Sequence, residues 1–190
     1  MMPADRRYVY EVRLIIKHLV DTHSFLELTP AYGCAVVTGF ARIEGRAIGL
    51  IANDCQMLGG AVDAEAAEKT ARFITLCDNF DIPILSLCDS PGFMVGPASE
   101  EQGAVRRMAQ LFVAGAKLNT SLVTIFLRKG YGLGAMAMAG GSFHKPIYSA
   151  AWPRGEFGGM GLEGAVRLGF KKELAAMPDD AQREALFTEL

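Results

Sequence analysis

The stretch that decides the fold runs from Leu127 to Gly164 and reads LRKGYGLGAMAMAGGSFHKPIYSAAWPRGEFGGMGLEG. It places a glycine-rich turn, Arg128–Gly134, between an apolar strand predicted over Leu122–Leu127 and a helix of small residues that follows from Ala135. Glycine lets a backbone come close to a ligand, and the N–H groups at the start of a helix favour negative charge. The pattern is therefore typical of a turn that binds a phosphate or holds the oxygen of an enolate.

Two common phosphate-binding motifs are excluded at this turn. No Gly-Lys-Ser/Thr follows at the spacing of a Walker loop, and GYGLGA lacks the third glycine of a dinucleotide-binding fingerprint. The glycines are also what a tight strand-to-helix turn with close helix packing requires. On the glycines alone, the binding interpretation and the packing interpretation both stay open.

A similar strand–loop–helix unit precedes the turn. The all-apolar segment Ile82–Cys88 predicts a strand in a sheet covered on both faces, and the loop Asp89–Pro97 follows it. Ser99 and Gln102 have the spacing of a capping box, which predicts a helix to about Leu118. Repeated units of this kind imply parallel strands, whose carboxyl ends share one edge of the sheet. We therefore expect both loops to meet where ligands bind in such sheets.

The remaining segments fit an α/β domain. A helix is predicted from about Tyr8 to Val20, and two strands, Ala35–Ile43 and Ala47–Ala52, are joined by a short hairpin. Asp63 is a plausible N-cap for a helix that reaches Phe80. The polar tail, Glu173–Leu190, is predicted to be helical and to end near the surface.

Composition excludes several classes of protein. The chain has 190 residues, 51% of them hydrophobic and 21% charged, which suits one globular domain with a proper core. A net charge of −2 without a basic patch argues against a nucleic-acid partner. No apolar run reaches the ~18–20 residues of a membrane span, and the start MMPADRRYVYEVR lacks the core of a signal peptide. We therefore expect a cytoplasmic protein with no membrane partner.

Cysteines and histidines do not indicate a metal site. The four cysteines have no metal-ligand spacing, and three of them lie in apolar surroundings, so we expect buried free thiols in a reducing compartment. The three histidines form no sequence motif, so no metal is expected.

Residues from about Tyr8 to Leu174 resemble the C-terminal half of the carboxyltransferase (β) subunit of biotin-dependent acyl-CoA carboxylases. These are the propionyl-, acetyl- and methylcrotonyl-CoA carboxylase type, within the crotonase superfamily. The resemblance implies an α/β crotonase-like fold of repeated ββα units with a mostly parallel sheet, in a single domain over residues 1–190. The matching segments are VVTGFARIEGRAIGLIAN, EKTARFITLCDNFDIPILSLCDSPGFMVG, RKGYGLGA and AWPRGEFGGMGLEGAV.

The resemblance implies transfer of a carboxyl group from carboxybiotin to the α-carbon of an acyl-CoA. Two enolates arise on this route, and backbone amides can hold their oxygens without a titratable side chain. Aligned by motif, the biotin-side donors are the amides of Leu133 and Gly134. The family more often has glycine and alanine at these two positions, so Leu133 departs from the family pattern. Its side chain narrows access to the two amides but removes no N–H donor.

The same resemblance assigns the neighbouring positions. Met136 corresponds to a residue that faces the acyl pocket, although a role as core filler stays equally open. The biotin approach is expected to be formed by Gly92, Phe93, Gly132 and Ala135.

Several other side chains are candidates for a functional role. Asp89 is expected to cap the backbone of its loop. Lys129 beside Arg128 is suited either to attracting a carboxylate or to an ordinary surface position. Ser142 and His144 lie two residues apart after Gly-Gly with no orienting acid nearby, which argues against a nucleophile–base pair.

The resemblance also implies partners. Family β subunits have two such domains, and the N-terminal one supplies the acyl-CoA oxyanion hole. We therefore expect a companion chain with the N-terminal half, a biotin carboxyl carrier protein, a biotin carboxylase, and a homo- or hetero-oligomer. Phe157–Leu162 is expected either to contact another protomer or to pack against the sheet. Two other functions stay open: an acyl-CoA decarboxylase subunit of the same superfamily, and a non-catalytic assembly subunit.

Overall fold

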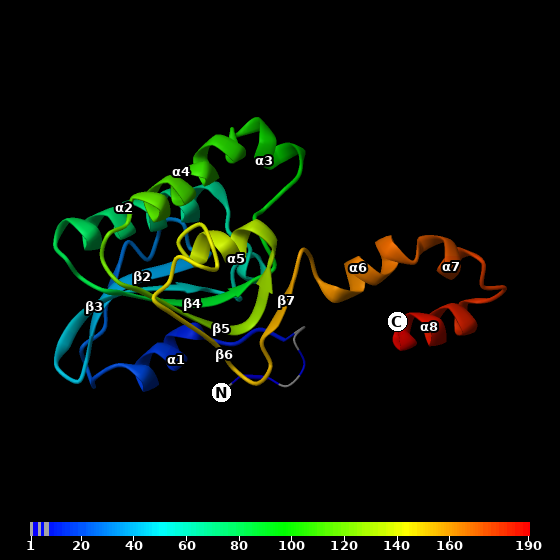
Figure 1. Ribbon diagram of the computed structural model, residues 1–190, viewed down its shortest axis with the longest axis horizontal. Helices are drawn as coiled ribbons and strands as arrows, with labels where there is room; N and C mark the ends of the chain where they lie inside the picture. The colour runs from blue at the N-terminus through cyan, green and yellow to red at the C-terminus, as the bar shows by residue number, and fades with distance from the viewer. Residues whose placement is uncertain (1, 4, 6–7) are drawn as a thin grey trace.

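The computed structural model describes residues 2–3, 5 and 8–190, and its centre is a seven-stranded sheet (Figure 1). The strands lie in the order β1-β2-β3-β4-β5-β6, with β7 also paired to β5. β1, β2 and β3 pair antiparallel, and the pairs from β3 onward are parallel. The predicted α/β class with a mostly parallel central sheet is confirmed. The strands are Leu26–Leu28 (β1), Val36–Ile43 (β2), Arg46–Asn53 (β3), Ile84–Ser90 (β4), Leu122–Tyr131 (β5), Tyr148–Ala151 (β6) and Glu156–Gly158 (β7).

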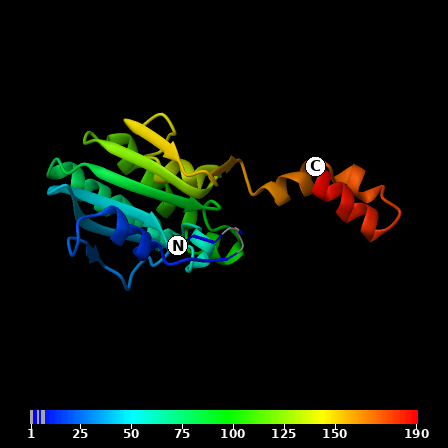
Figure 2. The same cartoon turned by 90° about the horizontal axis from the view of Figure 1, so that it is seen from below.

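Helices cover both faces of this sheet. α2, α4 and α5 lie over one face, while α1 lies under the other, as Figures 1 and 2 show. A short 3₁₀ turn, Leu58–Gly60, follows β3. The helices are Val12–Leu19 (α1), Ala64–Asn79 (α2), Pro97–Glu101 (α3), Ala104–Lys117 (α4), Gly132–Met138 (α5), Leu162–Gly169 (α6), Lys171–Ala175 (α7) and Asp180–Glu189 (α8). Among the described residues, none of these helices has the length and apolar character needed to cross a bilayer.

The central strands are mostly apolar because they face two cores. All seven residues of β4 are buried. In β4, Leu87 packs toward α1, whereas its neighbour Cys88 packs toward the α2 and α4 side. In β5, Leu127 likewise packs toward α1, and Phe126 packs toward the α2 and α4 side. Because successive side chains of a strand point to opposite faces, a strand between two helical layers has no polar side.

Two local predictions are confirmed with their physical cause. The β2–β3 hairpin turns on Glu44 and Gly45, both with positive φ (51° and 77°), which is typical of a two-residue hairpin turn. Asp63 precedes α2, and its carboxylate accepts a hydrogen bond of 2.8 Å from the Ala66 backbone N–H. This contact satisfies one of the donors that the first turn of a helix leaves without an intrahelical partner.

The predicted start of the first helix at Tyr8 is wrong, because α1 begins at Val12. The chain before α1 is held by contacts that oppose a helix. The backbone N–H of Tyr10 donates to the Cys55 sulfur at 3.2 Å, and its hydroxyl donates to Asp89 at 2.7 Å. Both partners are distant in sequence, so helical periodicity gave no sign of them.

The predicted capping box at Ser99 and Gln102 is also wrong. Ser99 lies inside the short helix α3, and Gln102 is the residue that ends it. Gly103 then adopts a left-handed backbone (φ 67°), and α4 begins at Ala104. A left-handed residue interrupts the helical hydrogen-bond pattern, so one predicted helix becomes two.

The strand predicted to end at Leu127 continues to Tyr131 as β5. Its last three residues pair in parallel with β7, with Lys129 opposite Glu156 and Tyr131 opposite Gly158. This pairing extends the strand through most of the glycine-rich segment, so only Gly132 and the residues after it form the start of α5.

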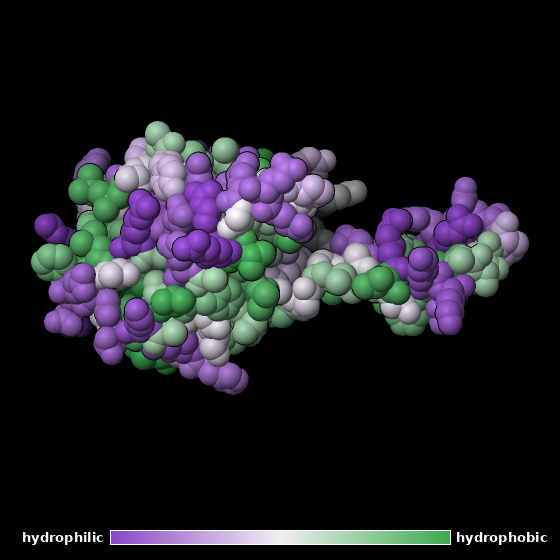
Figure 3. Space-filling view, turned by 90° about the horizontal axis from the view of Figure 1, so that it is seen from above, coloured by the Kyte–Doolittle hydropathy of each residue, from purple (hydrophilic) through white to green (hydrophobic). Residues whose placement is uncertain are grey.

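Beyond β7, the helices α6, α7 and α8 form an arm that extends away from the sheet (Figures 1 and 2). The predicted helical tail is confirmed by α7 and α8. Within α6–α8 the structure buries only Leu174, whereas Leu162, Leu168 and Phe170 are exposed apolar side chains. Figure 3 accordingly shows hydrophobic surface mixed with hydrophilic surface along the arm.

A polar contact between α2 and α4 gives a pH-dependent stability. Hydrogen bonds from Arg107, at 2.8 and 3.0 Å, and from Tyr32 lower the pKa of the Glu68 carboxyl from 4.5 to about 2. A lowered folded-state pKa stabilises the fold above pH ~4.5, and this contribution is lost as the pH falls toward 2.

We therefore expect Glu68→Gln to reduce the loss of unfolding free energy between pH 4.5 and pH 2. Urea unfolding at several pH values in this range measures the change in unfolding free energy. The control is the same substitution at the exposed residue Glu184. A Glu68→Gln curve with the same slope as the parent protein would show that the contact with Arg107 does not act in solution.

Candidate active site

The two loops predicted to meet do so at the carboxyl ends of β4 and β5. A Cβ atom added to Gly134, in the first turn of α5, would lie 2.5 Å from the carbonyl carbon of Gly92. The two backbones are therefore in direct contact, and Gly134 has no room for a side chain. The contact explains why glycine occupies Gly134, a fully buried position.

The Gly92 loop is held by short hydrogen bonds. The Ser90 hydroxyl is 3.1 Å from both the N–H and the carbonyl oxygen of Gly92, and the same carbonyl accepts from Val62 N–H at 3.0 Å. Phe93 forms a β-bridge with Val62, and Met94 N–H donates to the Val62 carbonyl at 2.9 Å. The loop that faces α5 is thus fixed from both sides.

The start of α5 presents backbone amides. Tyr131 precedes the helix in an extended conformation, Gly132 takes a left-handed φ of 55°, and Leu133 and Gly134 follow in the first turn. The first N–H groups of a helix have no acceptor in a preceding turn, and no described side chain caps this helix. Such amides can hold an oxygen that gains negative charge.

The other residues expected in the site differ in how far they are buried. Leu133 is exposed (61%), whereas Ala135 is fully buried, so Ala135 can offer only its backbone to a ligand. Met136 is half-buried. Phe93 is half-buried and packs against Phe112, with the ring centroids 6.0 Å apart.

A buried ion pair lies behind the turn. Asp89 and Arg128 have side chains 0% and 4% exposed, and the Arg128 Nε donates to the carboxylate at 2.9 Å. The same carboxylate accepts from the Tyr10 hydroxyl at 2.7 Å and from the Lys129 backbone N–H at 3.0 Å. Burial, followed by the Asp89 charge, raises the pKa of Tyr10 well above its usual range. Asp89 therefore ties together β4, β5 and the chain before α1.

These contacts correct one expectation, because Asp89 does not cap its own loop but bonds to the end of β5. Its partner Arg128 is buried. The Lys129 ammonium donates to the Gly59 carbonyl at 2.8 Å. The sequence contained one indication of the Asp89–Arg128 pair. Asp89 follows one predicted apolar strand and Arg128 follows the next, and the ends of neighbouring parallel strands lie at the same edge of a sheet.

Nucleophilic side chains near the turn are not activated. Cys88 is fully buried, and burial and the neighbouring Asp89 raise the pKa of its thiol, so it remains protonated. Cys55 and Cys77 are also buried and free, as expected from the sequence. The Ser142 oxygen accepts from the His144 backbone N–H at 3.2 Å, which is a turn contact rather than a bond to the imidazole.

Beside the start of α5 lies an apolar cavity of about 330 Å³. Phe93, Met94 and Val95 line it from the Gly92 loop, residues of α3 and α4 form the far side, and Leu133 closes it toward the turn. Glu100 is the one charged side chain among the residues that line it.

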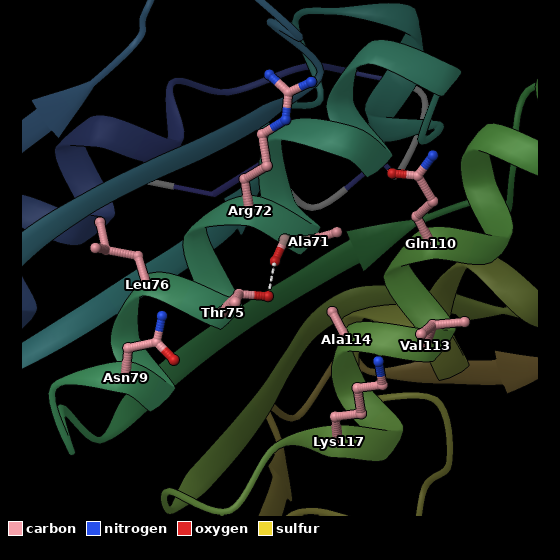
Figure 4. Close-up of a pocket in the computed structure, with 9 residues that line it drawn as sticks. All are labelled: Ala71, Arg72, Thr75, Leu76, Asn79, Gln110, Val113, Ala114 and Lys117. Atoms are coloured by element: carbon pink, nitrogen blue, oxygen red, sulfur yellow. Dashed lines mark hydrogen bonds between the residues drawn. The ribbon is translucent and has the colours of Figure 1, made fainter.

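A larger surface hollow, about 580 Å³, lies elsewhere. It is a groove between α2 and α4, lined by side chains such as Arg72, Thr75 and Lys117 (Figure 4). In Figure 4 the Thr75 hydroxyl bonds back to the Ala71 carbonyl of its own helix, at 2.9 Å. None of the residues expected in the active site lines this groove.

The chain has relatives among known proteins. The chain is 38% identical over 175 residues to the propionyl-CoA carboxylase beta chain of Saccharopolyspora erythraea. The aligned region is 92% of this chain and 32% of that protein. It is 35% identical over 181 residues to the methylmalonyl-CoA decarboxylase subunit alpha of Propionigenium modestum. The aligned region is 95% of this chain and 35% of that subunit. The chain thus spans about a third of the length of these curated relatives.

Two solved structures share the fold. A single-chain, multi-domain long-chain acyl-CoA carboxylase superposes with a TM-score of 0.89 at 54% identity, over 99% of this chain and 19% of that one. The transcarboxylase 12S hexamer with methylmalonyl-CoA bound superposes with a TM-score of 0.89 at 36% identity, over 99% of this chain and 36% of that one. The expected crotonase-like fold is confirmed.

The model of the carboxyl transferase domain family matches residues 1–189, nearly the whole chain, and both the sequence relatives and the superposed structures are carboxylases, transcarboxylases or decarboxylases. The chain therefore belongs to the carboxyl transferase domain family.

Proposed function

We propose that this chain forms the carboxybiotin side of an active site that transfers a carboxyl group to the α-carbon of an acyl-CoA. The observation that supports this most is the first turn of α5, where the amides of Leu133 and Gly134 lie beside the fixed Gly92 loop. Carboxybiotin supplies the activated carboxyl group. The two amides donate hydrogen bonds to the oxygen on which charge develops, and preorganised donors of this kind lower a barrier most where water is excluded.

The residues around the turn fit an uncharged ureido ring. The ring would approach the open side of the contact between Gly92 and Gly134, beside Gly132, with Phe93 as an apolar wall. Ala135 contributes its backbone, and Met136 approaches the acyl group. Since Cys88 stays protonated and His144 does not bond to Ser142 through its ring, these side chains take no part in the transfer.

The other half of the site comes from outside these 190 residues. Because the curated relatives are about three times as long, we propose that a companion carboxyltransferase half binds the acyl-CoA. A biotin carboxyl carrier protein and a biotin carboxylase would deliver the carboxyl group. The companion or a second copy is proposed to contact the segment Phe157–Leu162, where Phe157, Met160 and Leu162 are 51%, 43% and 45% exposed.

The test is reconstitution. Labelled bicarbonate, ATP, the biotin carboxylase, the carrier, the companion half and an acyl-CoA are combined with and without this chain, and label fixed in the acyl-CoA is counted. We expect fixation only when the chain and its companion are both present, together with a light-scattering mass above that of either protein alone. Fixation that does not depend on this chain would identify it as a non-catalytic assembly subunit.

A decarboxylase function is the second candidate, because a methylmalonyl-CoA decarboxylase subunit is among the relatives. It would use the same amides while carboxyl transfer runs from the acyl-CoA to biotin. The same mixture, supplied with a carboxylated acyl-CoA and carboxyl-free carrier, separates the two directions. Net loss of the acyl-CoA carboxyl group without ATP-dependent fixation would favour the decarboxylase.

A further inference from the structure

A hydrogen bond between Tyr131 and Glu156 lies directly behind the turn that presents the proposed oxyanion donors. Tyr131 is the last residue of β5 and the residue before α5, and it is only 3% exposed. Its hydroxyl donates to the Glu156 carboxylate of β7 at 2.5 Å. Hydrogen bonds from a hydroxyl to a carboxylate are shorter and roughly twice as strong as bonds between neutral groups. A phenylalanine ring would fill the same space, so packing alone does not account for the hydroxyl.

The segment that starts with β7 holds this end of β5 at several other points. The backbones of Tyr131 and Gly158 pair in the parallel ladder. A Cβ atom added to Gly132 would lie 3.0 Å from the Gly159 carbonyl oxygen. One added to Gly161 would lie 3.7 Å from the Tyr131 ring. The residue before α5 and the first residue of α5 therefore both rest against this segment.

The side chains of β7 grip β5 on both faces. Phe157 packs against Phe126 with the ring centroids 4.8 Å apart, and a Cβ atom added to Gly130 would lie 3.1 Å from the Phe157 ring. Successive side chains of a strand point to opposite faces, so Glu156 reaches β5 from the other face. Its bond to Tyr131 is the side-chain contact that joins β7 to the residue before α5.

We propose that Tyr131 and Glu156 are positioning residues, whose hydrogen bond fixes the turn Gly132–Gly134 in the geometry in which its amides hold the oxyanion. The proposal rests on the proposed function. Both side chains act through the backbone, and neither contacts a substrate. Preorganised donors lower a barrier only while they stay aimed at the developing charge, and a misplacement of about 1 Å can cost about 10²-fold in rate. Loss of the bond therefore lowers kcat and leaves substrate binding unchanged.

The test removes each partner in the reconstituted complex. Tyr131→Phe removes the donor and Glu156→Ala removes the acceptor. We expect each to lower kcat by about 10- to 100-fold, with KM unchanged for the acyl-CoA and for the carboxylated carrier. Glu156→Gln keeps an oxygen acceptor and should retain most of kcat. The double variant of Tyr131→Phe and Glu156→Ala should lose no more than either single variant, because both act through one bond.

The matched controls are Tyr148→Phe in β6, where the tyrosine is 62% exposed, and Glu184→Ala on the exposed helix α8. Both should keep the parent kcat. Rates are measured well below the unfolding temperature of each variant, so that a loss of stability alone does not lower kcat. A parent kcat in Tyr131→Phe or Glu156→Ala, a loss confined to KM, or additive losses in the double variant overturns the proposal while carboxyl transfer itself stands.

Hydrogen exchange in the same complex separates this proposal from the proposed function, because it needs no turnover. The backbone amides of residues 136–139 are closed by the hydrogen bonds of α5, so their exchange reports how firmly the helix start is held. We expect faster exchange in Tyr131→Phe and Glu156→Ala, but not in Glu156→Gln. This pattern in a complex that carboxylates no acyl-CoA would mean that the pair fixes the turn and that the proposed reaction fails. Parent exchange rates in both variants overturn the positioning role independently of catalysis.

Discussion

Replacement of Gly134 by valine is expected to abolish carboxyl transfer in the reconstituted complex. Even a Cβ atom at this position would lie 2.5 Å from the Gly92 carbonyl carbon, so the Gly92 loop and the first turn of α5 must separate. Loss of one oxyanion donor typically lowers kcat by about 10²–10³-fold, and displacement of the turn disturbs both proposed donors. The measurement is kcat for label fixation.

The backbone contact with Gly92 predicts that Gly134→Val also disturbs folding. Valine tests packing and catalysis together, so a second variant is needed. Replacing the amide of residue 134 by an ester removes the N–H donor and adds no side chain. We expect this variant to fold like the parent and to lose about 10²–10³-fold in kcat.

The controls are an ester at position 144 and the substitutions Ser142→Ala and His144→Ala. These positions lie in a surface turn, where the backbone N–H of His144 bonds to Ser142. All three variants should retain most of their activity. An inactive His144→Ala together with an active ester at position 134 would indicate acid–base or nucleophilic catalysis and would refute the amide mechanism.

Replacement of Asp89 by alanine is expected to have the largest effect on stability. It would leave the Arg128 guanidinium, 4% exposed, without its carboxylate, and would also remove the acceptor for Tyr10 and for the Lys129 backbone. Breaking a buried ion pair by removing one partner costs about 3–5 kcal/mol. Urea unfolding of the parent and the variant measures this free energy.

Two further variants show where the stability comes from. Asp89→Asn keeps the shape of the side chain but removes its charge, so we expect it to be less destabilising than alanine. Asp180→Ala removes an acid paired with Arg183 on the exposed helix α8 and should leave the unfolding free energy nearly unchanged. An Asp89→Ala protein as stable as Asp180→Ala would show that the buried pair contributes nothing.

The sequence determined those features that depend on neighbours along the chain. The order of a strand followed by a helix around Leu133, the hairpin at Glu44 and Gly45, and the cap at Asp63 follow from backbone preferences and from hydrogen bonds over a few residues. The all-apolar segment within Ile82–Cys88 also indicated correctly that helices cover both faces of the sheet. The edge where the two loops meet followed from the parallel order of the strands.

Only the tertiary structure decided what depends on partners far away in sequence. β5 extends to Tyr131 because β7 pairs with it, and the first helix starts late because Tyr10 is held by Cys55 and Asp89. The direct contact of Gly134 with Gly92 and the buried pair of Asp89 with Arg128 join segments about 40 residues apart. Periodicity and turn signals report local conformational energy, whereas these contacts form only after the sheet has brought distant strands together.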